Sequence, residues 1–109
     1  MWLPLTTYLE HRCPGWRRRR VSEVNRRLRY LGHVHLRRSY RPEELDVCLQ
    51  LLEHRPSQVV FYRDRALDHL TVTEYFFQRY GIACDEDDYS IALGPHGIVP
   101  LQLLEVYLE

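Results

Sequence analysis

The sequence has no long apolar run, since its longest apolar stretches cover only a handful of residues. This absence excludes a segment able to span a bilayer, and the start at Met1–Leu5 lacks the basic-then-apolar pattern of a signal peptide. The cysteines Cys13, Cys48 and Cys84 form no C-x-x-C pair and have no histidine at zinc-finger spacing, which excludes a zinc finger. We expect three reduced thiols, with Cys48 and Cys84 buried as small apolar side chains, in a cytoplasmic or nuclear protein.

Lysine is also absent, so all fifteen lysine-or-arginine positions are arginines. A GC-rich genome would explain that choice, whereas the placement of the charge is more informative. Residues 1–41 hold eleven arginines and two acids, a net charge of +9, and residues 42–109 hold four arginines and thirteen acids, a net charge of −9. The basic half either binds phosphates or docks on the acidic half, and the sequence leaves both alternatives open.

The length of 109 residues suits a single domain. Residues 1–20 predict an irregular basic segment, suited to a linker, with a turn at its proline–glycine pair. Residues 21–109 are the expected folded domain. It opens with a helix over residues 21–31, where apolar side chains recur at helical spacing, with Ser22 as its expected N-cap and Gly32 as its end.

The next segment, residues 33–52, contains one clear strand and one ambiguous stretch. Residues 33–37 alternate as a strand does, and Pro42 marks a turn. Residues 45–52 carry leucine or valine at alternate positions, which is the strand period, but they also satisfy the helix period. Local signals favour a helix there, because Pro42 followed by two glutamates is a good helix start.

The clearest local signal is the capping box from Thr71 to Glu74. In this motif the threonine hydroxyl accepts a hydrogen bond from the glutamate N–H, and the glutamate carboxylate reaches back. The motif predicts a helix that runs to Tyr80 and ends at Gly81.

Three strands complete the prediction. Residues 57–62 are rich in β-formers, and residues 89–93 form a second strand that is followed by a turn over residues 94–97. Pro100 allows only a short or edge strand after that turn. The order of helices and strands predicts an α+β domain built on a small curled sheet.

Three motifs in this sequence resemble the PAZ domain of Argonaute proteins. Residues 71–82, TVTEYFFQRYGI, are similar to the family's T-V-x-x-Y-F-x-x-[KR]-Y segment. Residues 52–57, LEHRPS, followed by Phe61, are similar to L-T-x-[RK]-P-A-S followed by a phenylalanine. Residues 94–104, GPHGIVPLQLL, are similar to the family's glycine and its Y-L-P-L-E-[VL]-C segment. The motifs occur in the family's order and spacing, and the best match covers residues 47–106.

The resemblance implies a fold and a ligand. The PAZ domain is a small OB-like β-barrel with a β-hairpin-plus-helix appendage, and the cleft between the two accepts the last two nucleotides of a single strand. On that map Ser57–Leu70 is the appendage hairpin and Val72–Tyr80 is its helix. Residues 33–52 become a barrel hairpin that turns near Pro42, which overrides the helix interpretation of residues 45–52.

On the appendage side of the cleft, the resemblance implies RNA-binding roles for Phe61, Tyr75, Arg79 and Tyr80. Tyr75 and Arg79 are four residues apart, so a helix places them on one face. In the family, the positions that match Tyr75, Arg79 and Tyr80 bind the terminal phosphate. The position that matches Phe61 stacks on the last nucleotide, and a stacked base contributes about 1–3 kcal/mol without sequence preference.

The opposite wall of the cleft admits two registers. In the first, residues 37–41, RRSYR, are similar to a K-R-K-Y-R-like run of the family. That register implies phosphate contacts from Arg38 and Tyr40, with His33 or His35 in place of the family's cleft histidine.

In the second register, the hairpin turns at Pro42. Arg38 then takes the position of the family's histidine, and Val47 takes the position of its tyrosine. Val99, at the start of the last motif, completes the RNA-binding residues that the resemblance implies.

We therefore expect an RNA-binding module that anchors the 3′ end of a guide-like single-stranded RNA in RNA silencing, and that works with other Argonaute domains. The alternative is a PAZ-derived module that binds protein through its acidic half and no longer binds RNA. Argonautes have further domains that do not fit in this length, so we expect a fragment, a truncated product or a stand-alone module.

An enzyme is the remaining hypothesis, and the sequence offers it little support. A small nuclease would have to combine histidines with the acidic loop, namely His33, His35 or His96 with Asp85, Asp87 and Asp88. No metal-ligand spacing, phosphate-binding loop or nucleophile motif accompanies them. We expect no catalytic residue, no metal, no cofactor and no membrane partner.

Overall fold

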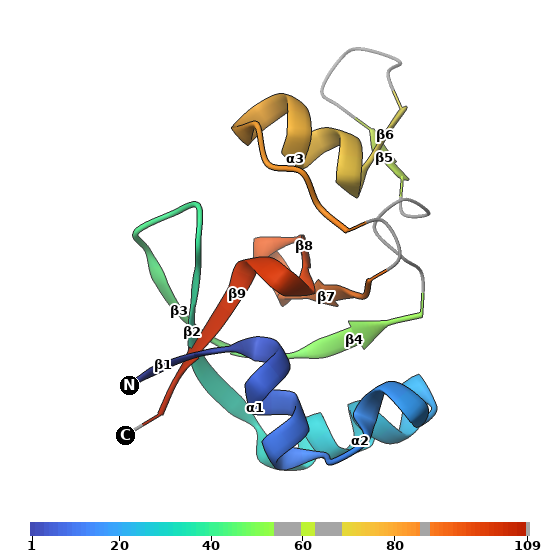
Figure 1. Ribbon diagram of the computed structural model, residues 1–109, viewed down its shortest axis with the longest axis vertical. Helices are drawn as coiled ribbons and strands as arrows, with labels where there is room; N and C mark the ends of the chain where they lie inside the picture. The colour runs from blue at the N-terminus through green and yellow to red at the C-terminus, as the bar shows by residue number, and fades with distance from the viewer. Residues whose placement is uncertain (54–59, 63–68, 86–87, 109) are drawn as a thin grey trace.

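Helices and strands mix along the chain in an α+β arrangement, as the sequence predicts. The computed structural model describes residues 1–53, 60–62, 69–85 and 88–108 (Figure 1). The helices in these residues are α1 (Leu5–Arg12), η1 (Trp16–Arg18), α2 (Val21–Leu31), α3 (Val72–Tyr80), η2 (Gly94–His96) and η3 (Leu101–Leu103), where η marks a 3-10 helix. The strands are β1 (Trp2–Pro4), β2 (His33–Arg38), β3 (Glu44–Cys48), β4 (Gln50–Leu52), β5 (Val60–Tyr62), β6 (His69–Thr71), β7 (Ser90–Ala92), β8 (Ile98–Pro100) and β9 (Leu104–Tyr107).

The described strands form three antiparallel sheets (Figure 1). The largest has the order β1-β9-β2-β3, the second has the order β4-β7-β8, and β5 pairs with β6. Among the strands that the structure describes, none of these sheets closes into a barrel. Within the same residues, no helix is long and apolar enough to cross a membrane.

The N-terminal segment is ordered, so the prediction of an irregular segment over residues 1–20 is wrong. Strand β1 pairs with β9 at the edge of the largest sheet, with Leu3 opposite Val106. Helix α1 buries Leu5 and Leu9 in the core, and Trp16 is also buried, with its ring 5.3 Å from that of Tyr89. The apolar side chains of this segment therefore need the rest of the fold as a partner, which its local sequence does not reveal.

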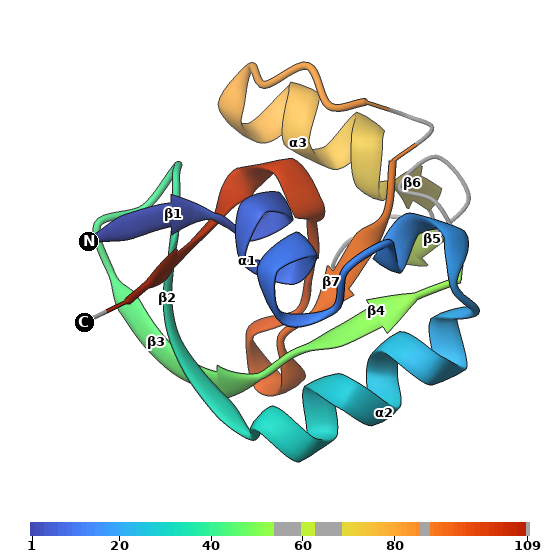
Figure 2. The same cartoon turned by 60° about the horizontal axis from the view of Figure 1, so that its bottom comes forward.

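Helix α2 confirms the helix predicted over residues 21–31. It starts one residue before Ser22, with Arg20 as the N-cap and no side-chain cap, and it ends at Gly32, whose φ is 75°. The buried Asn25 donates its amide to the Leu51 carbonyl at 2.8 Å and accepts the Leu51 N–H at 2.7 Å. These two bonds dock α2 along β4, as Figure 2 shows.

Strands β2 and β3 form the predicted hairpin, and the local preference for a helix over residues 45–52 is wrong. Their pairing places Leu36 opposite Leu45, and both are buried. Val47 also faces the core, which turns Cys48 outward, so the prediction of a buried Cys48 is wrong. Cross-strand burial decides the conformation here, because a strand buries alternate side chains and the helix alternative would not. The turn between the strands contains Pro42, as predicted.

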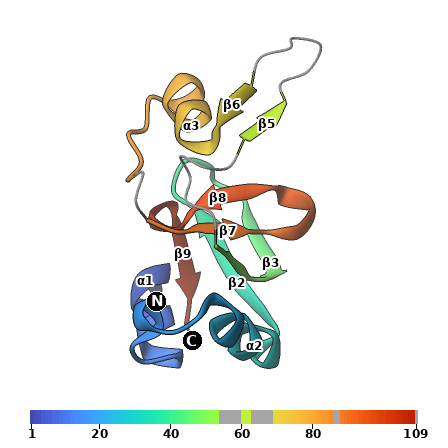
Figure 3. The same cartoon turned by 90° about the vertical axis from the view of Figure 1, so that its right-hand side faces the viewer.

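The predicted helix over residues 72–80 is confirmed as α3, which stands beside the β5–β6 hairpin and apart from the other helices (Figure 3). The Glu74 N–H donates to the Thr71 hydroxyl at 3.1 Å, and that hydroxyl lies 3.2 Å from the Glu74 carboxylate. Gly81 ends the helix in the left-handed region. The predicted hairpin over residues 57–70 falls partly outside the described residues, but its ends pair, with Phe61 opposite Leu70.

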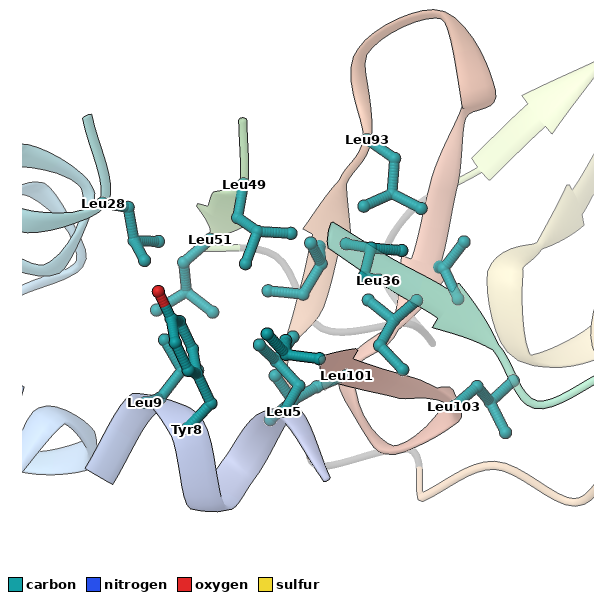
Figure 4. Close-up of a cluster of buried hydrophobic side chains, with 14 of the residues drawn as sticks. Leu5, Tyr8, Leu9, Leu28, Leu36, Leu49, Leu51, Leu93, Leu101 and Leu103 are labelled. Carbon is teal, nitrogen blue, oxygen red and sulfur yellow. The ribbon is translucent and has the colours of Figure 1, made fainter. Parts of the chain in front are cut away.

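The core lies between the sheets, α1 and α2. Strand β7 confirms the strand predicted over residues 89–93, and β8 is a short edge strand that contains Pro100. Figure 4 shows leucines that converge from α1, α2, η3 and the strands, among them Leu5, Leu9, Leu28, Leu36, Leu49, Leu51, Leu93 and Leu101. This core fixes the end of β2, the β8 edge and one face of α3 around a single hollow.

Candidate nucleic-acid interface

A cavity of about 530 Å³ lies where α3, the β2–β3 turn and the η2–β8 segment meet. Its lining residues are Arg38, Tyr40, Arg41, Glu43, Tyr75, Phe76, Tyr80 and residues 95–99. Five of the eight predicted RNA-binding residues are in this set: Arg38, Tyr40, Tyr75, Tyr80 and Val99. The structure thus brings together residues that lie as much as 61 positions apart in the sequence.

The wall formed by α3 is aromatic. Phe76 is buried and acts as its base, with its ring 5.5 Å from that of Tyr75 and 5.7 Å from that of Tyr80. Tyr75 and Tyr80 are partly buried and line the cavity. The helix carries its apolar side toward the domain, so its tyrosines reach the hollow at the boundary between core and solvent.

The opposite wall comes from the end of β2 and the turn after it. The Tyr40 ring lies 4.7 Å from the Tyr80 ring and 5.1 Å from the Phe76 ring, so the two walls touch at one end of the cavity. Arg38 is the deepest cation, with 5% of its side chain exposed, and its guanidinium pairs with the Glu43 carboxylate. Its Nε–H has no hydrogen-bond partner among the described residues.

The position of the hairpin turn agrees with the second of the two registers, because Pro42 lies in the turn and Val47 is buried on β3. Arg38 and Tyr40 nevertheless both line the cavity. The two registers therefore differ in how they align the sequence with the family and not in which of these two side chains reaches the cleft.

Two cavity tyrosines have a shifted pKa, and the shifts are in opposite directions. Burial, which outweighs the charge of Arg38, raises the pKa of Tyr40 to about 12. Burial alone would raise the pKa of Tyr80, but the hydrogen bond from Arg41, with a length of 3.3 Å, and the charge of Arg41 lower it overall. Neutral hydroxyls can donate to an anion, and a phosphate oxygen is such an acceptor.

The floor of the cavity is formed by the η2–β8 segment. Val99 lies at its inner end and is 2% exposed, so it contributes a packed surface and little accessible area. His96 and Ile98 lie on the same segment and also line the hollow. The cavity also includes Arg41, Glu43 and His96, to which the sequence assigned no RNA contact. The first two adjoin the predicted Arg38 and Tyr40 in the turn.

Among the predicted residues whose side chains the structure describes, Arg79 and His35 are not part of the lining. Arg79 is exposed on α3, with its guanidinium carbon 5.9 Å from the centre of the Tyr80 ring. Phe61 lies on β5, and its side chain is outside the described part of the structure. His35 lies on the opposite face of β2, because alternate side chains point to opposite faces.

The His35 ring belongs to a separate surface cluster. It makes hydrogen bonds of 2.7 Å to Glu44 Oε1 and 3.0 Å to Asp46 Oδ1, and these partners raise its pKa. Its ring centre lies 5.8 Å from that of Trp2 and 6.2 Å from that of Tyr107. The structure therefore separates His35 from the phosphate-binding residues that the first register groups it with.

The residues of the nuclease hypothesis are dispersed. His33 and His35 lie on β2, while His96 lines the cavity. Asp88 pairs with Arg17 at 3.0 Å, and Asp87 lies outside the described residues. In the described ranges, no group of three or more histidine, cysteine, aspartate or glutamate side chains is arranged to hold a metal ion.

Comparison with known proteins returns no match: no protein-family model matches the chain, and no curated protein matches its sequence. The chemistry of the cavity is clear from its residues. It offers a deep guanidinium, a second one at the rim, three hydroxyls and several ring faces within one hollow. Such a set suits an anionic group attached to a flat ring.

Proposed function

We propose that the cavity binds the 3′-terminal nucleotides of a single-stranded RNA, and that the chain is a PAZ-like module of RNA silencing. The observation that carries this proposal is the convergence of Arg38 and Tyr40 with Tyr75 and Tyr80 in one hollow. Arg38 and Tyr40 come from the end of β2 and the turn after it, Tyr75 and Tyr80 come from α3, and the two pairs form opposite walls. An open arrangement of antiparallel sheets with a separate hairpin-and-helix unit is compatible with the OB-like fold that the resemblance implies.

The phosphate is assigned to the end of the cavity near Arg38. A guanidinium that is 5% exposed and has an unpaired Nε–H is a strong site for an anion, since a buried donor without a partner is unfavourable. The ring centres of Tyr40 and Tyr75 lie 4.7 Å and 6.3 Å from that of Tyr80, and we assign their three hydroxyls as further donors to that phosphate. Arginine–phosphate contacts can use two N–H groups at once.

The sugar and base are assigned to the outer part of the cavity. Ring faces there bind any base without reading its edge, so we expect little sequence preference. A strand end can enter the hollow, whereas a blunt duplex presents paired and stacked bases that do not fit against the tyrosines. Specificity for a terminus follows from the shape of the site.

One residue favours the second candidate, a protein-binding module that no longer binds RNA. Glu43 lines the cavity and already neutralises Arg38, so it competes with a phosphate. Its side chain is 54% exposed, however, and can swing into water when an anion arrives. The two candidates therefore make opposite predictions for the effect of removing the Glu43 charge on RNA binding.

The direct test compares three ligands by fluorescence anisotropy: a short single-stranded RNA with a free 3′-OH, the same strand as a blunt duplex, and the single strand with a bulky 3′ block. We expect the free end to bind at least about tenfold more tightly than the other two, because the loss of one charge-assisted phosphate bond costs about 1.5–3 kcal/mol. Equal affinity for all three ligands would exclude end recognition.

Tyr80→Ala is the matching variant, and Phe77→Ala is its control. Phe77 lies on the same helix but is exposed and does not line the cavity. We expect Tyr80→Ala to lose most of the affinity for the free 3′ end while Phe77→Ala retains it. Far-ultraviolet circular dichroism checks that both variants keep the fold.

A further inference from the structure

A second hollow, of about 740 Å³, lies between the end of α1, the loop before α2, and α2 itself. Its lining is rich in arginine, with one acidic residue, Glu23. The side chains that matter here are Arg12, Arg19, Arg20, Arg26, Arg27 and Tyr30. We call this set the arginine groove. It lies far from α3, since α2 and α3 lie at opposite ends of the longest axis, along which the molecule extends 41 Å (Figure 1).

The arginines of the groove form no ion pair with any carboxylate among the described residues. Three arginines of the basic half pair with carboxylates, at Arg17–Asp88, Arg37–Glu105 and Arg38–Glu43. In the described part of the chain, no carboxylate oxygen lies within 4.0 Å of a nitrogen of any of the five groove arginines. Docking of the basic half on the acidic half therefore accounts for only part of its charge, and the groove holds five of the arginines that remain.

Backbone carbonyls hold two of the groove arginines in place. Arg19 Nε donates to the Pro14 carbonyl at 3.2 Å, and Arg27 Nε donates to the Arg12 carbonyl at 3.4 Å. Each bond orients a guanidinium without cancelling its charge. It also uses one of the five N–H groups that an arginine carries, so the terminal nitrogens remain able to donate to a ligand.

An aromatic ring stands at the edge of these cations. Tyr30 is 82% exposed, and the Arg27 guanidinium carbon lies 5.6 Å from the centre of its ring. An exposed tyrosine beside a row of arginines is the pattern of surfaces that bind single-stranded nucleic acid, since cations follow the backbone and a ring stacks on a base.

We propose that the arginine groove is a second, sequence-independent binding site for the phosphodiester backbone of single-stranded RNA. It recognises internal nucleotides, needs no strand end, and acts apart from the cavity beneath α3. An anionic protein or a membrane would be attracted by the same charge, and the comparison with vesicles tests the membrane alternative. The proposal goes beyond end binding and does not depend on it.

A circular single-stranded RNA is the decisive probe, because it has no terminus for the cavity. We expect it to bind the wild-type protein and to bind Tyr80→Ala equally well. The double variant Arg26→Gln/Arg27→Gln should bind it about tenfold more weakly, since it loses two charged donors. Its plot of log affinity against log salt should be shallower by about 1.4, at about 0.7 for each phosphate contact on a single strand.

The control is Arg18→Gln/Arg29→Gln, which removes the same charge from the same half of the chain. Neither residue lines the groove, so this variant should bind the circle nearly as well as the wild type does. Equal losses in the two double variants, or no loss in either, would overturn the proposal. Stronger binding to phosphatidylserine vesicles than to the circle would overturn it too and would assign the groove to a membrane. If Tyr80→Ala failed to bind the circle, the circle would bind through the cavity, and the proposal of a separate site would be refuted.

Discussion

The ion pair between Arg38 and Glu43 predicts that removal of the Glu43 charge lowers the stability of the fold and increases the affinity for RNA. Replacing Glu43 with glutamine keeps the shape of the side chain and removes its charge. The pair joins a guanidinium that is 5% exposed to a carboxylate that is 54% exposed, so solvent screens it and its contribution is at most about 1 kcal/mol. We therefore expect Glu43→Gln to lower the free energy of unfolding by about 0.5–1 kcal/mol.

The same change should tighten RNA binding. In the wild-type protein a phosphate must displace the carboxylate from Arg38, and it is repelled by that carboxylate while it remains nearby. Removing a competitor of about 1 kcal/mol increases the affinity by up to about fivefold. Fluorescence anisotropy with a 3′-OH single-stranded RNA measures the affinity, and urea denaturation measures the stability of the same preparation.

Glu44→Gln is the control, because it removes the same charge one position later. Glu44 contacts His35 on the other face of β2, so its loss should leave the affinity within about twofold at physiological salt, where the Debye length is about 8 Å. Weaker RNA binding by Glu43→Gln with an intact fold would refute the assignment of Arg38 as the phosphate site. It would favour a protein ligand that uses the carboxylate.

Two further predictions concern stability. Asn25→Ala leaves a buried N–H and a buried carbonyl of β4 without partners and should cost about 2–4 kcal/mol in urea denaturation, whereas Ser22→Ala should cost less than about 0.5 kcal/mol because Ser22 is not the helix cap. The hydrogen bonds of His35 to Glu44 and then Asp46 raise its pKa above 6.5. Their stabilisation is therefore complete below pH 6.5 and is lost as the pH rises through the higher pKa of the folded state; thermal denaturation over this range should show the decline in the wild type and not in His35→Gln. A flat wild-type profile would contradict the effect.

Local signals identify the elements whose ends are marked by their own residues. Helix α3 begins at a capping box and ends at a glycine, so its bounds follow from sequence. Residues 1–20 lack such marks, and α1 is stable because its apolar side chains meet the core. Residues 45–52 satisfy two periods at once, and only pairing with β2 selects the strand.

The residues of the candidate site likewise divide into those that local sequence patterns identify and those that depend on the fold. Tyr75 and Tyr80 follow from the position of the helix, and Arg38 and Tyr40 follow from the hairpin turn. The first register groups His35 with the cleft residues, but His35 lies on the opposite face of β2, because successive side chains of a strand point to opposite faces. The sequence does not indicate Glu43, because an acidic side chain is not expected beside a proposed phosphate site. Its contact with Arg38 depends on the geometry of the β2–β3 turn, which no local sequence pattern specifies.

Strand β1 has consequences for the order in which the chain acquires its structure during synthesis. Among the described strands its one sheet neighbour is β9, to which it pairs through Leu3 and Val106, more than 100 positions apart. Strand β1 is thus synthesised long before the strand with which it pairs. Until β9 is made, the apolar side chains of β1 and α1 stay open to solvent or to a chaperone, and contacts so distant in sequence slow folding. The synthesis of β9, more than any local helix, then determines when β1 and α1 close over the core.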